Sequence, residues 1–404
     1  MGGHRSRTGV AIAVAVVAAG AATVILRPRS GLIDPATIDP KAYFSEAELR
    51  RAEDFRGTQR LIGVGSLLVS GATLALLAVR PPAPARRLLE RVQDRPVRGA
   101  ALVAAAISVT LTVTGLPLSV WAHERSVDYG LSTQSLGPWF ADVGRSAVIG
   151  AVVAAIGGAV GIALIRRFPT RWWIPAAGAV TGFAVLVLYL SPVVIDPLFN
   201  RFEALPAGEL RSDVLRLADR AGVDVGEVYS VDASRRTTAI NAYVGGLGHT
   251  KRVVLYDNLI EGYPEEQVRS VVAHELGHVK HSDIPRGLLW VAIVALPGML
   301  VVQRLTEAID GRSGRPSALP ALALSLGLVS FALTCAGNAL SRPVEASADS
   351  YALELTGDPE GFIALERSLA LRNLGDPDPP ALFHTLFGTH PTTVERIGIG
   401  ERVR

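Results

Sequence analysis

The sequence predicts a mainly α-helical, polytopic membrane protein with about seven transmembrane helices and a small α+β region that is water-soluble. Hydrophobic residues make up 49% of the 404 residues, charged residues make up only 19%, and the mean hydropathy is +0.33. The apolar residues gather in seven long runs, which is typical of a chain that crosses a membrane repeatedly. Between the fifth and sixth runs, polar and apolar residues mix as they do in soluble domains.

Five of the runs lie in residues 1–190, which we expect to form an N-terminal membrane region. They are Thr8–Leu26, Leu61–Val79, Gly99–Trp121, Ser146–Ile165 and Ile174–Leu190. Each is close to the length of about 20 residues that crosses a bilayer as a helix. The first run could instead be a signal peptide cleaved near Ala19-Gly20-Ala21. Because the apolar residues continue to Leu26, we expect a retained helix.

The second region, residues 191–404, combines soluble elements with two further spans. Before Arg286 we expect one amphipathic helix and three strands separated by polar or glycine-rich turns. These elements are Glu209–Ala221, Val228–Val231, Ile240–Val244 and Arg252–Tyr256. The two spans follow at about 287–302 and 319–340, and a helical pattern from Val344 to Leu355 then opens a soluble tail.

One motif stands out in the soluble part: His274-Glu275-Leu276-Gly277-His278, an H-E-x-x-H sequence. Acidic residues at 265 and 266 and apolar residues at helical spacing predict that it lies on an α-helix. Residues four apart share one helix face, so the two imidazoles converge. Zn²⁺ binds such nitrogens, and Glu275 can act as general base beside them. The alternative, a chance match on an amphipathic helix, is disfavoured by so suitable a helix.

A catalytic zinc site takes three protein ligands, so a third ligand is needed. A histidine ten positions after the first would be one source, but position 284 is an isoleucine. A glutamate from a separate helix is the other source, and Glu345 with Asp349 four residues later fits it. Glu345 would bind the metal, while Asp349 would accept the ring N–H of a ligand histidine. Alone, these two acids would indicate only a solvated helix face.

Several neighbouring residues are left open by the sequence. His281 lies on the same helix stripe as His274 and His278, and we expect it behind the ligands or at an interface. His390, in a Thr-His-Pro turn, is either a surface histidine or a hydrogen-bond donor to the transition state. Asn338 and Arg342 flank the Glu345 helix and are equally open.

In this order, the motifs resemble those of the type I CAAX prenyl endopeptidases, integral-membrane zinc proteases of the gluzincin clan. The strongest elements are the histidine motif, the run Asn338–Arg342 leading into Glu345 and Asp349, and the strand Asn241-Ala242-Tyr243. Weaker matching segments follow one another along nearly the whole chain: Leu131–Trp139, Pro197–Phe202, Asp232–Arg236, Lys251–Asp257 and Thr389–Pro391.

The resemblance implies both a fold and a site. The fold would be seven transmembrane helices around a large intramembrane chamber, with a small α+β gluzincin catalytic domain. The site would hold one Zn²⁺ per chain on His274, His278 and Glu345, with His390 helping to stabilise the tetrahedral intermediate. Asn241, Ala242 and Tyr243 would form an edge strand that pairs with extended substrate, which is the recognition that a sheet edge offers.

Two other functional classes are weaker. A site-2-type intramembrane protease would carry its histidine motif inside a spanning helix, but charged residues flank this motif on both sides. A seven-helix transporter or receptor with an incidental metal site would carry ionisable groups inside its spans, and these spans have almost none. We therefore expect a zinc metalloendopeptidase that cleaves membrane-associated or CAAX-like peptides and proteins.

Composition narrows the partners and the location. The net charge is only +3 and the arginines are scattered between apolar runs, which argues against nucleic acid as a partner. The single cysteine, Cys335, excludes an internal disulfide and a cysteine-rich zinc site. Abundant arginine, alanine and glycine with little lysine indicate a GC-rich bacterial genome. We expect an integral protein of a bacterial plasma membrane. Because prenylated proteins are few in bacteria, membrane proteins under quality control are an alternative class of substrate.

The indications of orientation conflict. The arginine-rich loop Arg80–Arg98 lies opposite the catalytic segments, and the positive-inside rule applied to it would place those segments outside the cell. The family resemblance implies a cytoplasmic catalytic side instead. Because Arg27–Arg60, on the catalytic side, is also well supplied with arginine, the charge bias is contradictory, and we follow the resemblance.

Overall fold

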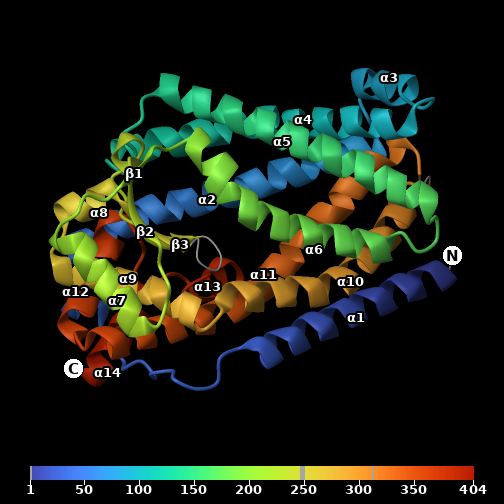
Figure 1. Ribbon diagram of the computed structural model, residues 1–404. Coiled ribbons are helices and arrows are strands. Elements are labelled where there is room, and N and C mark those ends of the chain that lie inside the picture. Colours follow the sequence, from blue (N-terminus) through green and yellow to red (C-terminus); the bar gives the residue numbers. More distant parts are fainter. Residues whose placement is uncertain (1, 246–250, 312–313) are drawn as a thin grey trace.

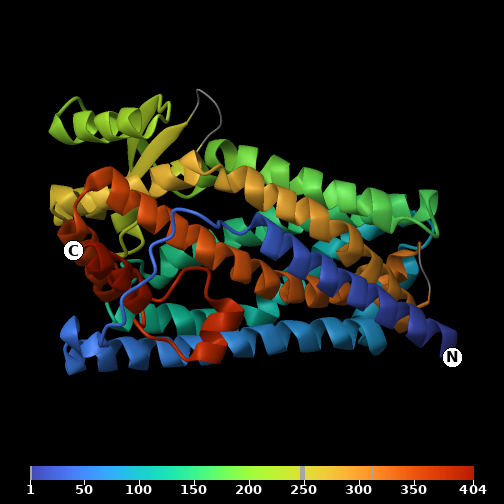
Figure 2. The same cartoon turned by 90° about the horizontal axis from the view of Figure 1, so that it is seen from below.

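The computed structural model describes residues 2–245, 251–311 and 314–404. Within these residues, seven helices are long and apolar enough to cross a membrane. They are α1 (Gly2–Leu26), α2 (Glu46–Val79), α4 (Pro96–Asp128), α5 (Leu136–Arg167), α6 (Trp173–Leu190), α10 (Asp283–Ile309) and α11 (Leu319–Thr356). They run along the long axis of the molecule (Figures 1 and 2). The mainly helical, seven-span fold predicted from the sequence is confirmed.

The outer faces of these helices carry large apolar side chains. Val17 and Leu68 are each 69% exposed and Val148 is 65% exposed. Such side chains would be costly in water, whereas a bilayer covers them at no cost. Between the helices, α1 packs against α10, where the indole N–H of Trp290 donates to Thr23 Oγ1 at 3.1 Å.

The helices are longer than the apolar runs that predicted them. α2 begins with a capping box in which Ser45 and Glu48 satisfy each other's backbone N–H groups, so its first turns are polar. α11 continues through Pro343 to Thr356. The pattern from Val344 to Leu355, predicted as a separate helix of the tail, is therefore the end of the last spanning helix. Packing of α11 against α9 and α10 supports the helix where the proline removes a hydrogen bond.

A four-stranded sheet lies at one end of the bundle, in the strand order β1-β2-β4-β3. The strands are β1 (Phe202–Ala204), β2 (Glu227–Val231), β3 (Ala242–Gly245) and β4 (Arg252–Tyr256). β2 and β4 are parallel and the other pairs are antiparallel. β2, β3 and β4 correspond to the three strands predicted from the sequence. β1 was not predicted, because it is too short to show an alternating pattern. β3 lies at an edge of the sheet. The glycine-rich turn predicted after β3 falls largely outside the described residues.

Six short helices complete this end of the molecule. They are α7 (Glu209–Ala221), α8 (Asp257–Gly262), α9 (Glu265–Lys280), α12 (Pro359–Arg372), α13 (Ala381–Phe387) and α14 (Thr393–Val403). A further helix, α3 (Ala83–Arg91), lies at the opposite end (Figure 1). α9 and α11 approach closely because residue 277 is a glycine, where an added Cβ would lie only 3.2 Å from Cα of Ala348. This contact brings the predicted histidine motif and Glu345 to the same place.

Candidate metal centre

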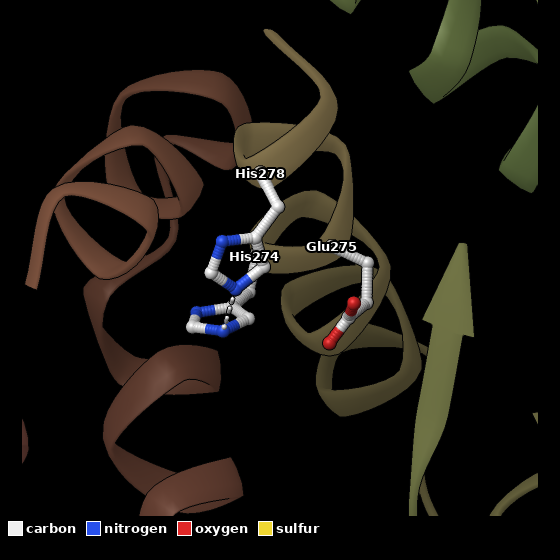
Figure 3. Close-up of side chains that lie close together, drawn as sticks. All are labelled: His274, Glu275 and His278. Atoms are coloured by element: carbon white, nitrogen blue, oxygen red, sulfur yellow. Dashed lines mark hydrogen bonds between the residues drawn. The ribbon is translucent and has the colours of Figure 1, made fainter. Parts of the chain in front are cut away.

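α9 carries the histidine motif on the face opposite its apolar stripe. Val272 and Leu276 are buried in the core that α9 shares with the sheet. His274 and His278 point the other way, and their Nε2 atoms lie 3.1 Å apart with the rings nearly perpendicular. Figure 3 shows both rings on the side of α9 that faces a neighbouring helix, with Glu275 on the side of a strand.

Glu345 of α11 faces the two histidines. Its Oε2 lies 3.2 Å from His274 Nε2 and 3.5 Å from His278 Nε2. Although imidazole nitrogens crowd this buried oxygen, it accepts no hydrogen bond from the described part of the chain. Ligands held at about 2.0–2.2 Å around tetrahedral zinc lie roughly 3.3–3.6 Å from one another. The three atoms therefore fit a Zn²⁺ ion between them.

Glu275 offers another carboxylate close to the histidines. One of its oxygens and the two ring nitrogens lie within 4.8 Å of one another. Glu345 is nearer to both rings, so Glu275 is better suited to a molecule bound beside the ion than to the ion itself. Burial raises the pKa of Glu275, which brings the carboxyl group closer to the range in which general bases and acids exchange protons.

The second ring nitrogen of each histidine faces a carboxylate. Nδ1 of His274 lies 2.7 Å from Asp349 Oδ1, in keeping with the predicted partnership. Nδ1 of His278 lies 2.9 Å from Asp283 Oδ2, a partner that was not predicted from the sequence. Ser282, in the left-handed conformation with φ of 56°, turns the chain back so that Asp283 reaches the ring. An acid just beyond the end of the helix was the available signal.

These carboxylates make the two rings attractive to positive charge. Burial would lower the pKa of His274, but the negative charge of Asp349 and the hydrogen bond to it outweigh burial and raise the pKa to about 10. Burial would also lower the pKa of His278, but the hydrogen bond to Asp283 outweighs this effect and helps to raise the pKa to about 9. A centre that holds a proton this firmly without a metal offers the same electrostatic stabilisation to a cation.

Arg396 of α14 closes the back of the centre. Its guanidinium donates to both oxygens of Asp349, at 2.6 Å and 2.8 Å, and its Nη1 lies 2.9 Å from Glu366 Oε2. The two carboxylates are almost completely buried, and the Arg396 side chain is 13% exposed. Neither Arg396 nor Glu366 was predicted from the sequence, because a contact between distant helices leaves no local pattern.

His390 reaches the centre from the loop between α13 and α14. Its Nε2 lies 3.2 Å from Glu345 Oε2, and its Nδ1 lies 2.8 Å from Thr389 Oγ1. About half of the side chain is exposed. Of the two roles left open by the sequence, proximity to the ligand set favours the one in which His390 contacts a bound molecule.

Arg342 and Asn338 hold the segment that leads to His390. Arg342 Nη1 donates to the carbonyl of Gly388 at 2.8 Å and reaches that of Thr385 at 3.3 Å. Asn338 Nδ2 donates to the carbonyl of Leu386 at 2.7 Å. These carbonyls belong to the C-terminal end of α13, whose last groups have no partner within the helix. The two side chains of α11 therefore fix where the His390 loop begins.

His281 lies away from the ligand atoms. Its Nδ1 is 3.2 Å from Ser347 Oγ, and its ring packs edge-on against Tyr351 with 5.4 Å between ring centres. It thus lies at the interface of α9 and α11, which was one of the two positions expected for it.

The edge strand and a cavity adjoin the centre. The Asn241 carbonyl accepts from the Tyr256 N–H at 3.1 Å, and because such bonds alternate along an antiparallel pair, Ala242 and Val244 turn their N–H and C=O groups away from β4. A cavity of about 450 Å³ beside β3 is lined by Asn241, His274, Glu275 and His390, among others.

Comparisons with known proteins agree with this architecture. Residues 204–399 match the family model of peptidase family M48, and residues 41–201 match a model described as CAAX prenyl protease N-terminal, five membrane helices. The uncharacterized metalloprotease YhfN of Bacillus subtilis is 33% identical over 383 residues, which are 90% of this chain and 88% of the relative. CAAX prenyl protease 1 of Saccharomyces cerevisiae is 28% identical over 323 residues, or 72% and 69% of the two chains. The crystal structure of S. mikatae Ste24p has the same fold, with a TM-score of 0.75 and 19% identity over 98% of each chain.

Proposed function

The chain belongs to peptidase family M48, as its motifs indicated, and on this premise we propose that it is a membrane-embedded zinc endopeptidase that works through Glu275 as general base. As a member of this family, the chain is a metalloendopeptidase that is embedded in a membrane. One observation carries the finer proposal: the buried Glu345 oxygen lies 3.2 Å and 3.5 Å from two imidazole nitrogens without accepting a hydrogen bond in the described chain.

We propose that His274, His278 and Glu345 hold one Zn²⁺ ion. Asp349 and Asp283 would each accept the Nδ1–H of one histidine, which fixes the tautomer whose Nε2 lone pair is free for the metal. When bound, zinc acts as a Lewis acid that polarises a peptide carbonyl and lowers the pKa of water. The protease domain in this proposal is residues 191–404, because α9 and α11 both contribute ligands, and residues 1–190 form the membrane region.

The proton transfers are assigned to Glu275. Its carboxylate takes a proton from the attacking water as the new C–O bond forms at the peptide carbonyl carbon. The resulting acid then gives this proton to the leaving amine as the C–N bond breaks. Burial raises the pKa of Glu275, which makes the carboxylate a better proton acceptor and so supports this exchange. His390 donates from its ring to the oxygen of the tetrahedral intermediate, where charge develops.

Substrate binding is assigned to β3 and the residue before it, Asn241–Tyr243. The outward N–H and C=O groups of Ala242 can pair with an extended peptide, as at other open sheet edges. The cavity of about 450 Å³ beside β3 would take a side chain next to the scissile bond. An extended peptide presents its carbonyls at regular intervals. Pairing with β3 would therefore place one carbonyl next to Glu275, within reach of the water that Glu275 deprotonates.

The substrates are proposed to be membrane-associated or CAAX-like peptides and membrane proteins. Glu345 of the metal centre lies on α11, which is one of the seven helices long and apolar enough to cross the membrane. Substrates held in the bilayer would therefore already be close to the centre. The intramembrane chamber around which the seven helices would be arranged stays a prediction. We also propose a bacterial plasma membrane with the active site facing the cytoplasm, which rests on the family resemblance.

Cleavage of an unstructured peptide by the detergent-purified full chain tests the proposal. We expect cleavage that chelation abolishes and added Zn²⁺ restores. Glu275→Gln should lose activity by at least about 100-fold while the bound zinc, measured by atomic absorption, stays at one per chain. Wild-type activity in this variant, or loss of its zinc, would refute the role of general base. Glu266→Gln, on the same helix but outside the centre, is the matched control and should stay active.

A further inference from the structure

The end of the bundle opposite the metal centre is rich in arginine. The segment 80–98, which includes α3, contributes six arginines, and the loop after α5 and the segment before α11 contribute more. Figure 1 shows α3 beside the end of α4 that is far from the sheet, and α5 ends on the same side of the molecule. This cluster plays no part in the chemistry proposed above.

Three of these arginines line one hollow. Arg166, Arg167 and Arg315 border a cavity of about 690 Å³. The rest of its lining includes Val97, Ala163, Ile165 and Pro169, which are apolar. The hollow thus combines a cationic rim with an apolar wall.

The hollow is built from three separate parts of the chain. The start of α4, the last turn of α5 and the segment before α11 meet there. Gly314 has a φ of +89°, and a Cβ at this residue would lie 3.6 Å from both Arg166 Cγ and Ile165 Cγ2, so the segment packs directly on α5. Ile165 belongs to the buried core of the bundle. The position of the arginines is therefore fixed by the fold.

The three arginines have no acidic partner. All are exposed, and none forms an ion pair within the described chain. At the other end of the molecule arginines are paired: Arg60 with Asp376, and Arg236 with Asp142. Arg167 lies over the ring of Phe168, 5.1 Å from its centre, which leaves its charge without a counter-ion. Three guanidinium groups without an acidic partner around one hollow favour an anion from outside the protein.

The position of the hollow in the fold favours a lipid headgroup as that anion. It lies at the end of spanning helices, where lipid headgroups are found, and Trp173 at the start of α6 is a residue typical of a membrane interface. Complementing the C-terminal dipole of α5 would account for Arg166 and Arg167 but not for Arg315. Arginine binds phosphate in two-pronged fashion, and basic pockets between spanning helices bind anionic lipid headgroups.

We propose that this hollow binds the headgroup phosphate of an anionic glycerophospholipid from the adjacent leaflet. The guanidinium groups of Arg166, Arg167 and Arg315 contact the phosphate, and the apolar wall formed by Val97 and Ala163 accepts the start of an acyl chain. A tightly held lipid would tie α4, α5 and the segment before α11 together at the end remote from the metal centre.

Native mass spectrometry of the delipidated, detergent-purified full chain tests this site. Dioleoyl-phosphatidylglycerol should bind at least about 10-fold more tightly than dioleoyl-phosphatidylcholine. Removing all three charges, as Arg166→Gln, Arg167→Gln and Arg315→Gln together, should weaken phosphatidylglycerol binding roughly 100-fold, or about 5-fold per arginine. Phosphatidylcholine binding should change little.

The matched control removes three charges from α3 at the same end: Arg86→Gln, Arg87→Gln and Arg91→Gln. It should alter phosphatidylglycerol binding by less than about 3-fold. Equal losses in both triple variants, or equal binding of the two lipids, would overturn the site. Displacement of the lipid by a few millimolar inorganic phosphate would assign the hollow to a free anion instead. If the triple variant fails to fold, Arg315→Gln alone should still show the 5-fold loss, and an unchanged affinity would refute the proposal.

Discussion

Arg396 donates hydrogen bonds to both carboxylate oxygens of Asp349, at 2.6 Å and 2.8 Å. Asp349 in turn lies 2.7 Å from Nδ1 of His274. A carboxylate held in this way can accept only along fixed directions, so it orients the imidazole as well as setting its tautomer. The metal centre thus depends on α14, more than a hundred residues after the histidine motif in the sequence.

Substitutions at Glu345 and Asp349 should have different effects on the metal. Glu345→Ala removes a proposed ligand, so we expect loss of zinc and of activity together. Asp349→Ala leaves all three ligands but frees the His274 ring, so zinc affinity or activity should fall by about 10–100-fold. Zinc titration and peptide cleavage measure both. Wild-type zinc content and activity in Glu345→Ala would mean that the third ligand is another residue.

Arg342 should act through His390. Arg342→Ala frees the carbonyls that precede the His390 loop, and we expect kcat to fall by about 10–100-fold with zinc unchanged. His390→Ala should lower kcat by about 100–1000-fold, as loss of a donor to the transition state does. If the two residues serve one function, the double variant should be no slower than His390→Ala alone. Fully additive losses would show that Arg342 acts independently of His390.

The fold could be predicted because its main signals are local. Each span is a continuous apolar run, and α7 was predicted with the bounds that the structure shows, Glu209–Ala221. The ends of the spans were not predictable in this way. Helices such as α11 continue past their apolar runs with polar residues. Packing against the helices of the soluble part supports this extension, and the sequence does not reveal that packing.

The residues of the site likewise fall into those with a local sequence signal and those without one. His274, His278, Glu345 and Asp349 could be proposed because residues four apart on a helix share a face. Asp283, Arg396 and Glu366 could not, because each acts across a turn or between helices that are distant in sequence. Asn338 and Arg342 were noticed as part of a motif, but their contacts with α13 required the structure.

Two fusions should decide the orientation. The C-terminus lies at the end that carries the sheet, and α3 lies at the opposite end (Figure 1). With the active site in the cytoplasm, a fluorescent protein fused after Arg404 should fluoresce, and alkaline phosphatase fused after residue 90 should be exported and active. The arginines around α3 favour the reverse by the positive-inside rule. The reciprocal result, phosphatase activity at Arg404 and fluorescence at residue 90, would place the active site outside and leave its chemistry unchanged.

Glu366 shares the Arg396 guanidinium with Asp349. Its Oε2 lies 2.9 Å from Arg396 Nη1, whereas its Oε1 is buried without a hydrogen-bond partner in the described chain. One guanidinium cannot neutralise two buried carboxylates. Burial, opposed by Arg396 and assisted by the charge of Asp349, raises the pKa of Glu366 to about 7.

This shift predicts a stability that depends on pH. The folded protein keeps the Glu366 proton up to about pH 7, while the unfolded chain loses it near pH 4.3, so ionisation destabilises the fold as the pH rises between these values. Glu366→Gln is neutral at every pH. Relative to that of the wild type, its free energy of unfolding should therefore rise from pH 5 to pH 8, by on the order of 1–3 kcal/mol.

Thermal unfolding of the zinc-loaded proteins in detergent measures this difference. Glu360→Gln, an exposed position on the same helix, should show a constant difference from the wild type. A difference that is equally flat for Glu366→Gln would mean that Glu366 is ionised throughout, and that Arg396 stabilises both carboxylates.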